Sequence, residues 1–600
     1  MKSKLAGWTA NLLSMVGRAV LIQASSSAIL AYVMQSNLLP NKVLEGIDRV
    51  NRNFLWGSAE NKRKLHWVGW KKVTRLKEEG GLGLQTAKGR NRALLAKLNW
   101  RFHNEDKAPW AKVLRLKNCN HQRLNSRNVD KLPSSRTWKG VLKGEETFKK
   151  GTKWLPGFKS KMDFWYDNWS NFGPLRSIIH GPLSQESSNL KIKDVVDYTG
   201  SWNWPIIQMD LPDEVIRELK ATPIPLFARV EDRLVWKYSP KGAFDLKSAY
   251  LLAIESVRDI PFKGSWIWKL KVLPRIQVFV WKCMHHSIGV RQCLRERGMQ
   301  MEANCPWCHR EDETILHALW DCPLSKSIWY QLGWWTNDSL FFTQNLHDWL
   351  NTNATLGQHH VSGQLPWHLV FLFGIWFLWK GRNNLIFKNI DQNPSLAKVI
   401  VDCALEYHFS ANNSLATKRL VLKNIRWEKP RNGWLTLNTD GSVASNSGIV
   451  GGGGLIRDAN GDWVMGFARR IGTTSSFMAE LWALRDGLQL CLHLHTQAVS
   501  IDLDSKSIVE VFNSQTHANT FISSLIEDCK HMISKIPQTR TRHIFREANR
   551  CVDFLAKLGT SCEDDFIVFS SPPVDLLCVL EADASGQFVS RLCPDVFFAI

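Results

Sequence analysis

Apolar residues recur at helical spacing through the N-terminal and middle parts of the chain. They lie three and four positions apart over residues 5–30, 93–102 and 366–410, which predicts helices with one buried face. The run Gly80-Gly81-Leu82-Gly83 interrupts the first part of this pattern. Residues 130–245 combine tryptophan, proline and glycine with short apolar runs, and no regular element can be assigned to them.

From Trp434 onward the pattern changes to strands that alternate with helices. Strands are predicted over residues 434–442, 449–456, 463–469 and 499–503, with a fifth that ends near His543, and helices over 475–492 and after His543. The turn at residues 458–462 contains Asn-Gly and is typical of a hairpin. The four glycines at 451–454 lack the lysine and serine or threonine of a phosphate-binding loop, so we expect close backbone packing or a bulge there.

The expected fold class is multidomain, because 600 residues are too many for one ordinary core. Mainly α N-terminal and middle regions, with a small Cys3His module, should precede an α/β domain built on a five-stranded mixed sheet with flanking helices. The predicted regions are 1–118 (basic, helical), 130–245 (unassigned, tryptophan-rich), 246–335 (cysteine-containing), 366–412 (helical connector), 430–560 (α/β) and 561–600 (acidic tail).

Charge is distributed unevenly along the chain. The net charge is +22 and the pI is about 9.5, which favours an anionic partner, with nucleic acid ahead of a membrane surface. Residues 1–130 hold 24 lysines and arginines against 8 acids, whereas residues 561–600 hold one arginine and seven acids. The basic surface is therefore expected at the N-terminus, and the acidic end is expected to be a separate appendage.

The chain has no pattern typical of a secreted or membrane-spanning protein. The apolar stretch at 12–30 contains Arg18 and several polar residues, which favours an amphipathic helix over a signal sequence. The most apolar window, 369–379, is 11 residues long, and a bilayer needs about 20. We expect an intracellular protein with reduced thiols, neither secreted nor transmembrane, for which the nucleus is one candidate location.

Four residues have the spacing of a structural zinc site. Cys305, Cys308, His317 and Cys322 form the pattern C-x2-C-x8-H-x4-C, with His317 on a helix predicted over 313–320. Three thiolates and one imidazole complete a closed tetrahedral shell around one Zn²⁺. The alternative is that four buried residues have this spacing by chance.

Four acids lie at strand ends or in helices of the predicted α/β domain. Asp440 lies near the end of the first strand, Glu480 in the first turns of a helix, Asp504 at the end of a later strand and Asp553 between apolar residues of the last helix. Singly, the first three could be strand-end or helix-capping residues. Together they predict four carboxylates at one end of a sheet, where two Mg²⁺ ions would balance their repulsion and support phosphodiester hydrolysis. Asp502 competes with Asp504, because residues two apart share one strand face.

The N-terminal region resembles the C-terminal part of plant non-LTR (LINE-type) retrotransposon reverse transcriptases. The resemblance rests on Leu13-Ser14-Met15-Val16-Gly17-Arg18, Leu39-Pro40, Asn53-Phe54-Leu55-Trp56-Gly57 and the glycine run at 80–83. In that family these segments follow the polymerase palm. The chain contains no Ala-Asp-Asp motif, and its one pair of adjacent aspartates, Asp564-Asp565, lies in the tail. We therefore expect a remnant without polymerase activity.

The cysteine-containing region resembles the zinc-binding region downstream of the same reverse transcriptases. All four ligand positions match, and the segments Trp266-Ile267-Trp268, Pro274-Arg275, Phe279-Val280-Trp281-Lys282 and Arg297-Gly298 fit the family as well. The resemblance thus supports a zinc module within 246–335.

The C-terminal region resembles the type 1 ribonuclease H domain in its plant retrotransposon-associated form. The matching motifs are Asn438-Thr439-Asp440-Gly441-Ser442, Met478-Ala479-Glu480, Leu503-Asp504-Ser505 and the segment from His543 to Asp553. The last motif departs from the family at Phe545 and Val552, where proline and alanine are common.

This resemblance implies a nuclease that cuts the RNA strand of an RNA–DNA hybrid. It implies that Asp440, Glu480, Asp504 and Asp553 hold two Mg²⁺ or Mn²⁺ ions and that His543 helps protons or product to leave. Two alternatives remain open, namely an inactive nucleic-acid-binding relic and a zinc-mediated interaction protein.

Overall fold

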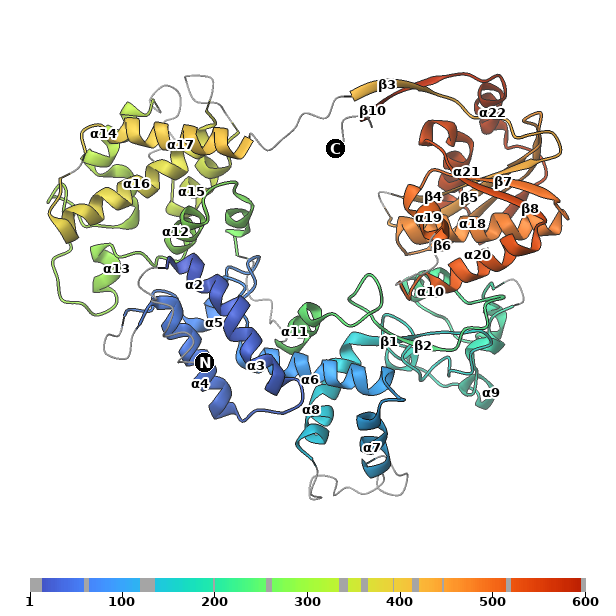
Figure 1. Cartoon of the computed structure of the whole chain (residues 1–600), viewed down its shortest axis with the longest axis horizontal. Coiled ribbons are helices and arrows are strands. Elements are labelled where there is room, and N and C mark those ends of the chain that lie inside the picture. The colour runs from blue at the N-terminus through green and yellow to red at the C-terminus, as the bar shows by residue number, and fades with distance from the viewer. Residues whose placement is uncertain are drawn as a thin grey trace. The chain divides into compact units, whose positions relative to one another are not determined.

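A computed structural model describes residues 13–58, 64–118, 135–197, 200–254, 262–333, 344–357, 365–391, 393–412, 420–444, 447–513 and 519–594 (Figure 1). The chain forms two units, each assembled from separate segments. Unit 1 comprises Met1–Asn99, Ala108–Glu145 and Tyr250–Thr417, and unit 2 comprises Trp100–Lys107, Glu146–Ala249 and Lys418–Ile600.

Unit 1 is built from helices, as the apolar spacing predicts. Its first part holds α2 (Met15–Leu21), a π-helical turn (Ile22–Ser26), α3 (Ser27–Met34), α4 (Asn41–Trp56), α5 (Trp70–Val73), most of α6 (Ala87–Asn104), α7 (Pro109–Asn118) and the start of α8 (Arg136–Gly151). Residues 5–12 of the first predicted helix lie outside the described residues. Helix α4 ends where Gly57 adopts a left-handed conformation with φ 69°, which glycine tolerates without strain.

The second part of unit 1 shares one apolar core with the first. It contains most of α11 (Leu246–Ile254), then α12 (Pro274–Met284), α13 (Arg291–Arg295), α14 (Pro323–Gln331), α15 (Leu346–Thr355), α16 (Trp367–Lys388) and α17 (Leu396–Asn412). The core joins residues of α2 and α4 to residues of α12, α15 and α16, among them the fully buried Trp281 and Trp349. Many of the tryptophans therefore serve packing.

The stretch Met15–Met34, 20 residues long, is long and apolar enough to cross a membrane by length and composition, and the mean hydropathy of its most apolar 18-residue window is 1.4. Core helices of soluble proteins and signal sequences pass the same test, and 12% of this stretch is buried.

The tryptophan-rich segment, for which the sequence pattern predicts no element, forms a small module within unit 2. Strands β1 (Thr152–Leu155) and β2 (Arg233–Trp236) pair antiparallel, and α9 (Gln185–Ser188) and α10 (Asp213–Ala221) lie between them in the chain. Phe164, Trp165, Trp169 and Trp202 are buried in its core. Most elements between β1 and β2 are short, and buried indole N–H groups donate to backbone carbonyls, such as that of Trp202 to Leu219. The unassigned stretch 130–245 nevertheless holds two longer helices that the sequence pattern does not predict, α8 (Arg136–Gly151) and α10.

The C-terminal part of unit 2 is a mixed sheet of six strands in the order β8-β7-β4-β5-β6-β9. Five of the strands occupy predicted positions: β4 (Leu435–Val443), β5 (Val450–Arg457), β6 (Trp463–Gly472), β7 (Ala498–Leu503) and β8 (Gln538–His543). The helices are α18 (Ser476–His493), α19 (Lys506–Asn513), α20 (Ser523–Lys535) and α21 (Arg550–Ser561).

The prediction of five strands is wrong by one, and the sixth comes from the predicted tail. Strand β9 (Phe566–Phe569) pairs antiparallel with β6. Helix α22 (Leu577–Ala584) follows, and β10 (Val589–Pro594) pairs with β3 (Leu420–Ile425). The acidic tail is therefore not a separate appendage, because its apolar residues complete the sheet edge and its acid Asp583 is buried beside Arg457.

The glycines at 451–454 let helices approach both faces of β5. A Cβ at Gly453 would lie 2.3 Å from the backbone nitrogen of Ala556 in α21, whereas one at Gly452 would lie 3.3 Å from the Cβ of Ala483 in α18. The expected close backbone packing is confirmed, and α18 and α21 cover opposite faces of the sheet.

Candidate active site and metal centre

The parallel strands bring three of the predicted site residues to one edge of the sheet. Thr439 of β4 pairs with Leu503 of β7, and Leu503 pairs with His543 of β8. The residues that follow, Asp440 and Asp504, therefore lie side by side where β4 and β7 approach their carboxyl ends. His543 is exposed, and its Nε2 lies 3.2 Å from the carbonyl oxygen of Asp504.

Two helices bring the other two acids to the same edge. Ser475 caps α18 by accepting a hydrogen bond from the backbone of Met478 at 3.3 Å, and Glu480 follows in the next turn. Gly441 permits this approach, because a Cβ there would lie 2.6 Å from the backbone nitrogen of Glu480. Asp553 lies in the first turn of α21 on the opposite face.

Burial and mutual repulsion perturb the carboxyl groups that meet here. Asp440 is 3% exposed, and its burial, together with the charges of Asp504, Glu480 and Asp553, raises its pKa to about 8. Burial and the charge of Asp504 raise the pKa of Glu480 to about 7, against a hydrogen bond from Ser505. Burial also raises the pKa of Asp504. The four acids thus lie close enough to interact, which is costly without cations.

One buried oxygen at this edge has no protein partner. Oδ1 of Asp440 accepts a hydrogen bond from the backbone N–H of Gly441 at 2.7 Å, whereas Oδ2 is buried and has no hydrogen-bond partner. Carboxylate oxygens are the ligands that Mg²⁺ and Mn²⁺ prefer. The donor set and this unpaired oxygen therefore fit divalent metal ions.

Asp502, the competitor of Asp504, is engaged elsewhere. It is fully buried, and both of its oxygens accept hydrogen bonds from the guanidinium of Arg542, each at 2.7 Å. Oδ1 also accepts from the hydroxyl of Ser500 at 3.0 Å. Because these hydrogen bonds occupy both carboxylate oxygens, Asp502 stabilises the fold and is not free to bind a metal. The geometry therefore favours Asp504 for the site.

Sequence reasoning missed Arg546 as a site residue. Its Nη2 lies 3.2 Å from Oδ1 of Asp553, and the charges of Asp553, Asp440 and Asp504 raise its pKa although burial lowers it. Its place within the last motif, between His543 and Asp553, was the signal that could have identified it. This guanidinium and the ammonium of Lys557, whose Nζ lies 2.6 Å from Oδ2 of Asp553, partly offset the negative charge of the acids.

A pair of buried asparagines sets the distance between β4 and α21. Asn438 donates to Oδ1 of Asn549 at 3.2 Å, and Asn549 donates to the carbonyl of Thr439 at 3.1 Å. Arg457 donates to Oδ1 of Asn438 at 3.0 Å. Because Asn438 precedes Asp440 by two residues and Asn549 precedes Asp553 by four, these bonds position both acids.

The four predicted zinc ligands of unit 1 converge. Their ligand atoms all lie within 4.8 Å of one another. The sulfurs of Cys305 and Cys322 are 3.9 Å apart, and the sulfur of Cys308 lies 3.3 Å from Nε2 of His317. Ligands about 2.0–2.3 Å from one ion lie roughly 3.3–3.8 Å apart in a tetrahedron, so the arrangement fits Zn²⁺.

His317 has an orienting partner that the sequence pattern did not suggest. Its Nδ1 lies 2.8 Å from Oδ1 of Asp321, which leaves Nε2 to face the sulfurs. Burial lowers the pKa of His317, but hydrogen bonds to Asp321 and to the cysteine sulfurs raise it to about 10. In this setting a metal ion would replace a proton on the imidazole.

The helix predicted over 313–320 begins later than expected. His317–Asp321 form a π-helical turn after a short start at Ile315, and Glu313 lies outside the helix. The reason is a buried ion pair, in which both oxygens of Glu313 accept from Arg382 of α16 at 2.6 Å. This pair anchors the metal-binding segment to the core of unit 1.

Comparisons with known families identify both regions. A family model described as "zinc-binding in reverse transcriptase" matches residues 244–329, and a model described as "Reverse transcriptase-like" matches residues 438–559. A protein of Arabidopsis thaliana named "Putative ribonuclease H protein" is 32% identical over 596 residues, covering 98% of this chain and 96% of that protein. An uncharacterized mitochondrial protein of the same plant is 30% identical over 143 residues, covering 24% of this chain and 92% of that protein.

Solved structures also match part of this chain. The N-terminal RNase H domain of rv2228c from Mycobacterium tuberculosis is 21% identical, covers 21% of this chain and 93% of its own, and gives a TM-score of 0.20. LC11-RNase H1 in complex with an RNA/DNA hybrid is 24% identical, covers 21% of this chain and 96% of its own, and gives the same TM-score of 0.20.

Proposed function

Because the chain belongs to the family of retrotransposon-derived reverse transcriptase and ribonuclease H proteins, we propose that it is a metal-dependent endonuclease without polymerase activity. Its substrate would be the RNA strand of an RNA–DNA hybrid, and we place its action inside the cell, where such hybrids form. The adjacent aspartates offer no polymerase site, since Asp565 forms an ion pair with Lys220.

One observation carries this proposal. Asp440, a buried acid with one unpaired oxygen, lies among three further carboxylates at a single sheet edge. Four acids that repel one another are stabilised when cations bind among them, and nucleases commonly hold their metals in this way. We infer that Asp440, Glu480, Asp504 and Asp553 hold two Mg²⁺ or Mn²⁺ ions.

Several residues of the chain would have separate roles in hydrolysis. Bound divalent ions supply positive charge for the attacking and leaving oxygens of phosphodiester hydrolysis. The four carboxylates position that charge, and the bonds between Asn438 and Asn549 hold the carboxylates in register. His543 is exposed beside Asp504 and can carry a proton away, while Arg546 can contact a substrate phosphate.

Asp440→Asn tests the proposal directly. The amide keeps the size of the side chain but removes its charge, so Mg²⁺-dependent cleavage of a labelled RNA–DNA hybrid should fall by about 100-fold or more. The matched control is Asp462→Asn, because Asp462 is an exposed acid of the turn between β5 and β6. It should cleave at the wild-type rate.

Cleavage by Asp440→Asn at the wild-type rate would refute the assignment of the site. Wild-type protein that binds the hybrid but does not cut it with Mg²⁺ or Mn²⁺ would instead identify an inactive nucleic-acid-binding relic. Circular dichroism melting of both variants separates a loss of chemistry from a loss of fold.

We also propose that Cys305, Cys308, His317 and Cys322 bind one structural Zn²⁺. Their convergence within 4.8 Å supports a closed shell with no position left for a substrate. The apparent binding free energy of such a site is on the order of 10 kcal/mol, and it contributes to the folding of its module.

Replacing Cys308 by Ser should remove the zinc and unfold the surrounding segment. Metal analysis should find one zinc per chain in wild-type protein and in the control Cys403→Ser, which changes a thiol outside the ligand set, and none in Cys308→Ser. Cleavage by unit 2 should persist in Cys308→Ser. Folded, reduced wild-type protein without zinc would contradict this assignment.

A further inference from the structure

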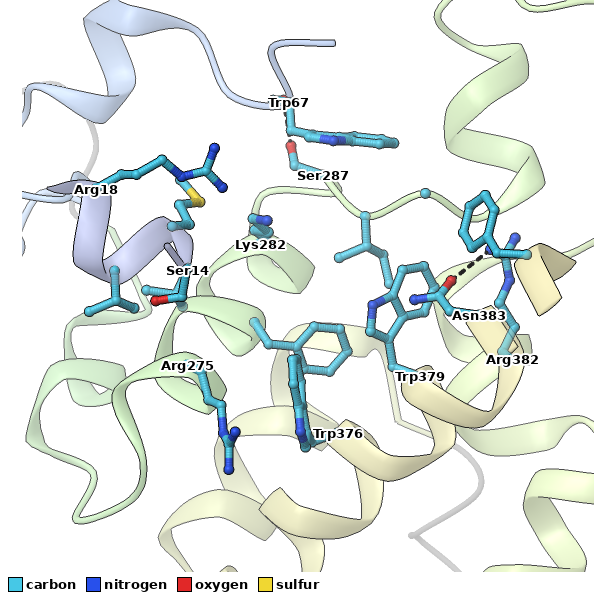
Figure 2. Close-up of a pocket in the computed structure, with 17 residues that line it drawn as sticks. Ser14, Arg18, Trp67, Arg275, Lys282, Ser287, Trp376, Trp379, Arg382 and Asn383 are labelled. Atoms are coloured by element: carbon cyan, nitrogen blue, oxygen red, sulfur yellow. Dashed lines mark hydrogen bonds between the residues drawn. The ribbon is translucent and has the colours of Figure 1, made fainter. Parts of the chain in front are cut away.

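Two adjoining cavities in unit 1 are lined by basic and aromatic side chains. The larger has a volume of about 390 Å³ and the smaller about 360 Å³. Met15, Arg18, Trp67 and Lys282 line both cavities, and these four residues form their shared wall. Figure 2 shows Arg18 and Lys282 on neighbouring helices, with the Trp67 ring above them and Trp376 and Trp379 on α16.

The two cations in the shared wall, Arg18 and Lys282, have no carboxylate beside them among the described lining residues. Nε and Nη1 of Arg18 are buried and have no hydrogen-bond partner. Burial and the charge of Arg18 lower the pKa of Lys282 to about 8. Among the described residues that line either cavity, none is an aspartate or glutamate. Such an arrangement is costly in the free protein and becomes favourable when an anion binds.

The other basic residues of the lining differ from this pair. Arg382 is neutralised by Glu313, and its guanidinium lies 5.1 Å from the ring of Trp379. Arg275 and Lys64 are exposed at the rims of the larger and smaller cavity, respectively. Positive charge therefore extends from the half-buried pair of Arg18 and Lys282 out to solvent on both sides, as an extended polyanion requires.

Half-buried aromatic rings alternate with these charges. Trp67, Trp376 and Trp379 all line the larger cavity and are neither fully buried nor fully exposed. One face of Trp67 is covered by the guanidinium of Arg297 at 4.9 Å, which fixes the ring. Fixed aromatic rings beside cations suit unstacked bases attached to phosphates, because bases stack on the rings while phosphates pair with the cations.

We propose that the two cavities form a binding site for single-stranded nucleic acid, with phosphates at Arg18 and Lys282 and bases against Trp67, Trp376 and Trp379. A duplex keeps its bases stacked inside and cannot use these rings, whereas a single strand can. The site belongs to unit 1 and is independent of the proposed nuclease site. Under this proposal the basic N-terminal region binds single strands at a defined site, and does more than attract phosphate through its net charge.

The test measures binding of a labelled single-stranded RNA of about 12 nucleotides to the full chain by fluorescence anisotropy. No divalent metal and no chelator is added, so that any bound zinc is retained. Lys282→Met should weaken binding by about 10-fold and flatten the slope of log affinity against log salt by roughly 0.7. The control Lys97→Met changes an exposed lysine of α6 that lines neither cavity, and it should bind like wild type.

A second pair of variants tests the rings. Trp67→Leu should weaken RNA binding by roughly 5- to 10-fold, and Trp67→Phe should restore most of it. With an abasic oligonucleotide, Trp67→Leu should have no effect, while Lys282→Met should still weaken binding. Lys282→Met replaces a half-buried cation by an apolar side chain of similar length, so it keeps the fold and tests the proposal even if Trp67→Leu does not fold.

Four outcomes would overturn the proposal. The first is unchanged affinity in Lys282→Met, and the second is an equal loss in Lys97→Met. The third is displacement of the RNA by uridine monophosphate at equal concentration, which would assign the cavities to free nucleotides. Binding of a double-stranded hybrid should be insensitive to Trp67→Leu, and a loss there equal to the loss for single-stranded RNA would likewise contradict it.

Discussion

Lys282 is a half-buried cation of unit 1 with no carboxylate beside it among the described lining residues. Burial and Arg18 lower its pKa from 10.5 to about 8. Below pH 8 the side chain is protonated in both the folded and the unfolded chain, so the full cost of burying the charge is present. Between pH 8 and 10.5 only the unfolded chain keeps the proton, and the stability of the unit therefore rises with pH.

Lys282→Met should remove this cost. At pH 7 we expect the free energy of unfolding of unit 1 to increase by roughly 1–3 kcal/mol, and the gain should shrink as pH approaches 10.5. Thermal melts of wild type, Lys282→Met and Lys97→Met at several pH values check this. A gain that does not depend on pH would show that better packing, and not the charge, is responsible.

At the scale of elements, the C-terminal helix α22 carries an acid that completes a buried network of unit 2. Asp583 is 3% exposed, and its carboxylate lies 3.3 Å from Nη1 of Arg457 and 3.1 Å from Nη2 of Arg550. Arg457 in turn bonds Asn438, two residues before Asp440. Helix α22 thereby supports the strand that carries the central acid of the candidate site.

Asp583→Asn should destabilise unit 2, because it leaves Arg457 buried without its charge partner. Breaking a buried pair from one side costs about 3–5 kcal/mol. The control Asp575→Asn changes an exposed acid just before α22 and should alter stability by less than about 0.5 kcal/mol. Urea unfolding of both variants measures the difference, and equal midpoints would mean that α22 is not part of the cooperative unit.

At the scale of the whole molecule, unit 2 is assembled from segments far apart in the chain. The carboxylate of Asp528, fully buried in α20, accepts hydrogen bonds from the backbone N–H groups of Leu226, Phe227 and Ala228, each at 2.9 Å. Arg485 of α18 is also fully buried and donates to the carbonyl of Ile224 at 3.2 Å. The tryptophan-rich module therefore satisfies two buried charges of the ribonuclease H-like domain.

A fragment limited to residues 418–600 should consequently melt at a lower temperature than one in which residues 146–249 are joined to it by a glycine–serine linker. We expect a difference of roughly 5–10 °C, since Asp528 loses three hydrogen bonds and Arg485 loses one, which leaves them with their mutual ion pair. Calorimetry of the two fragments provides the measurement. Identical melting temperatures would show that the module contributes nothing to the domain.

Much of this protein was determined by local sequence. The sequence pattern predicts strands β4 to β7, the end of β8 and helix α18 within a few residues, because alternation and helical spacing are properties of neighbouring residues. The convergence of Cys305, Cys308, His317 and Cys322 could be predicted for the same reason, since one short segment carries all four. The acids at the strand ends could be grouped because parallel strands end at a common edge.

Only the tertiary structure decided the features that depend on distant partners. Strand β9 is short and lies in an acidic segment, so its pairing with β6 had no local signal. The choice between Asp502 and Asp504 depended on Arg542, and the delayed start of the helix before His317 depended on Arg382. In the last two cases a buried carboxylate pairs with an arginine that is distant in the sequence, and in the first a short strand pairs with the edge of a sheet. The spacing of residues along the chain encodes neither contact.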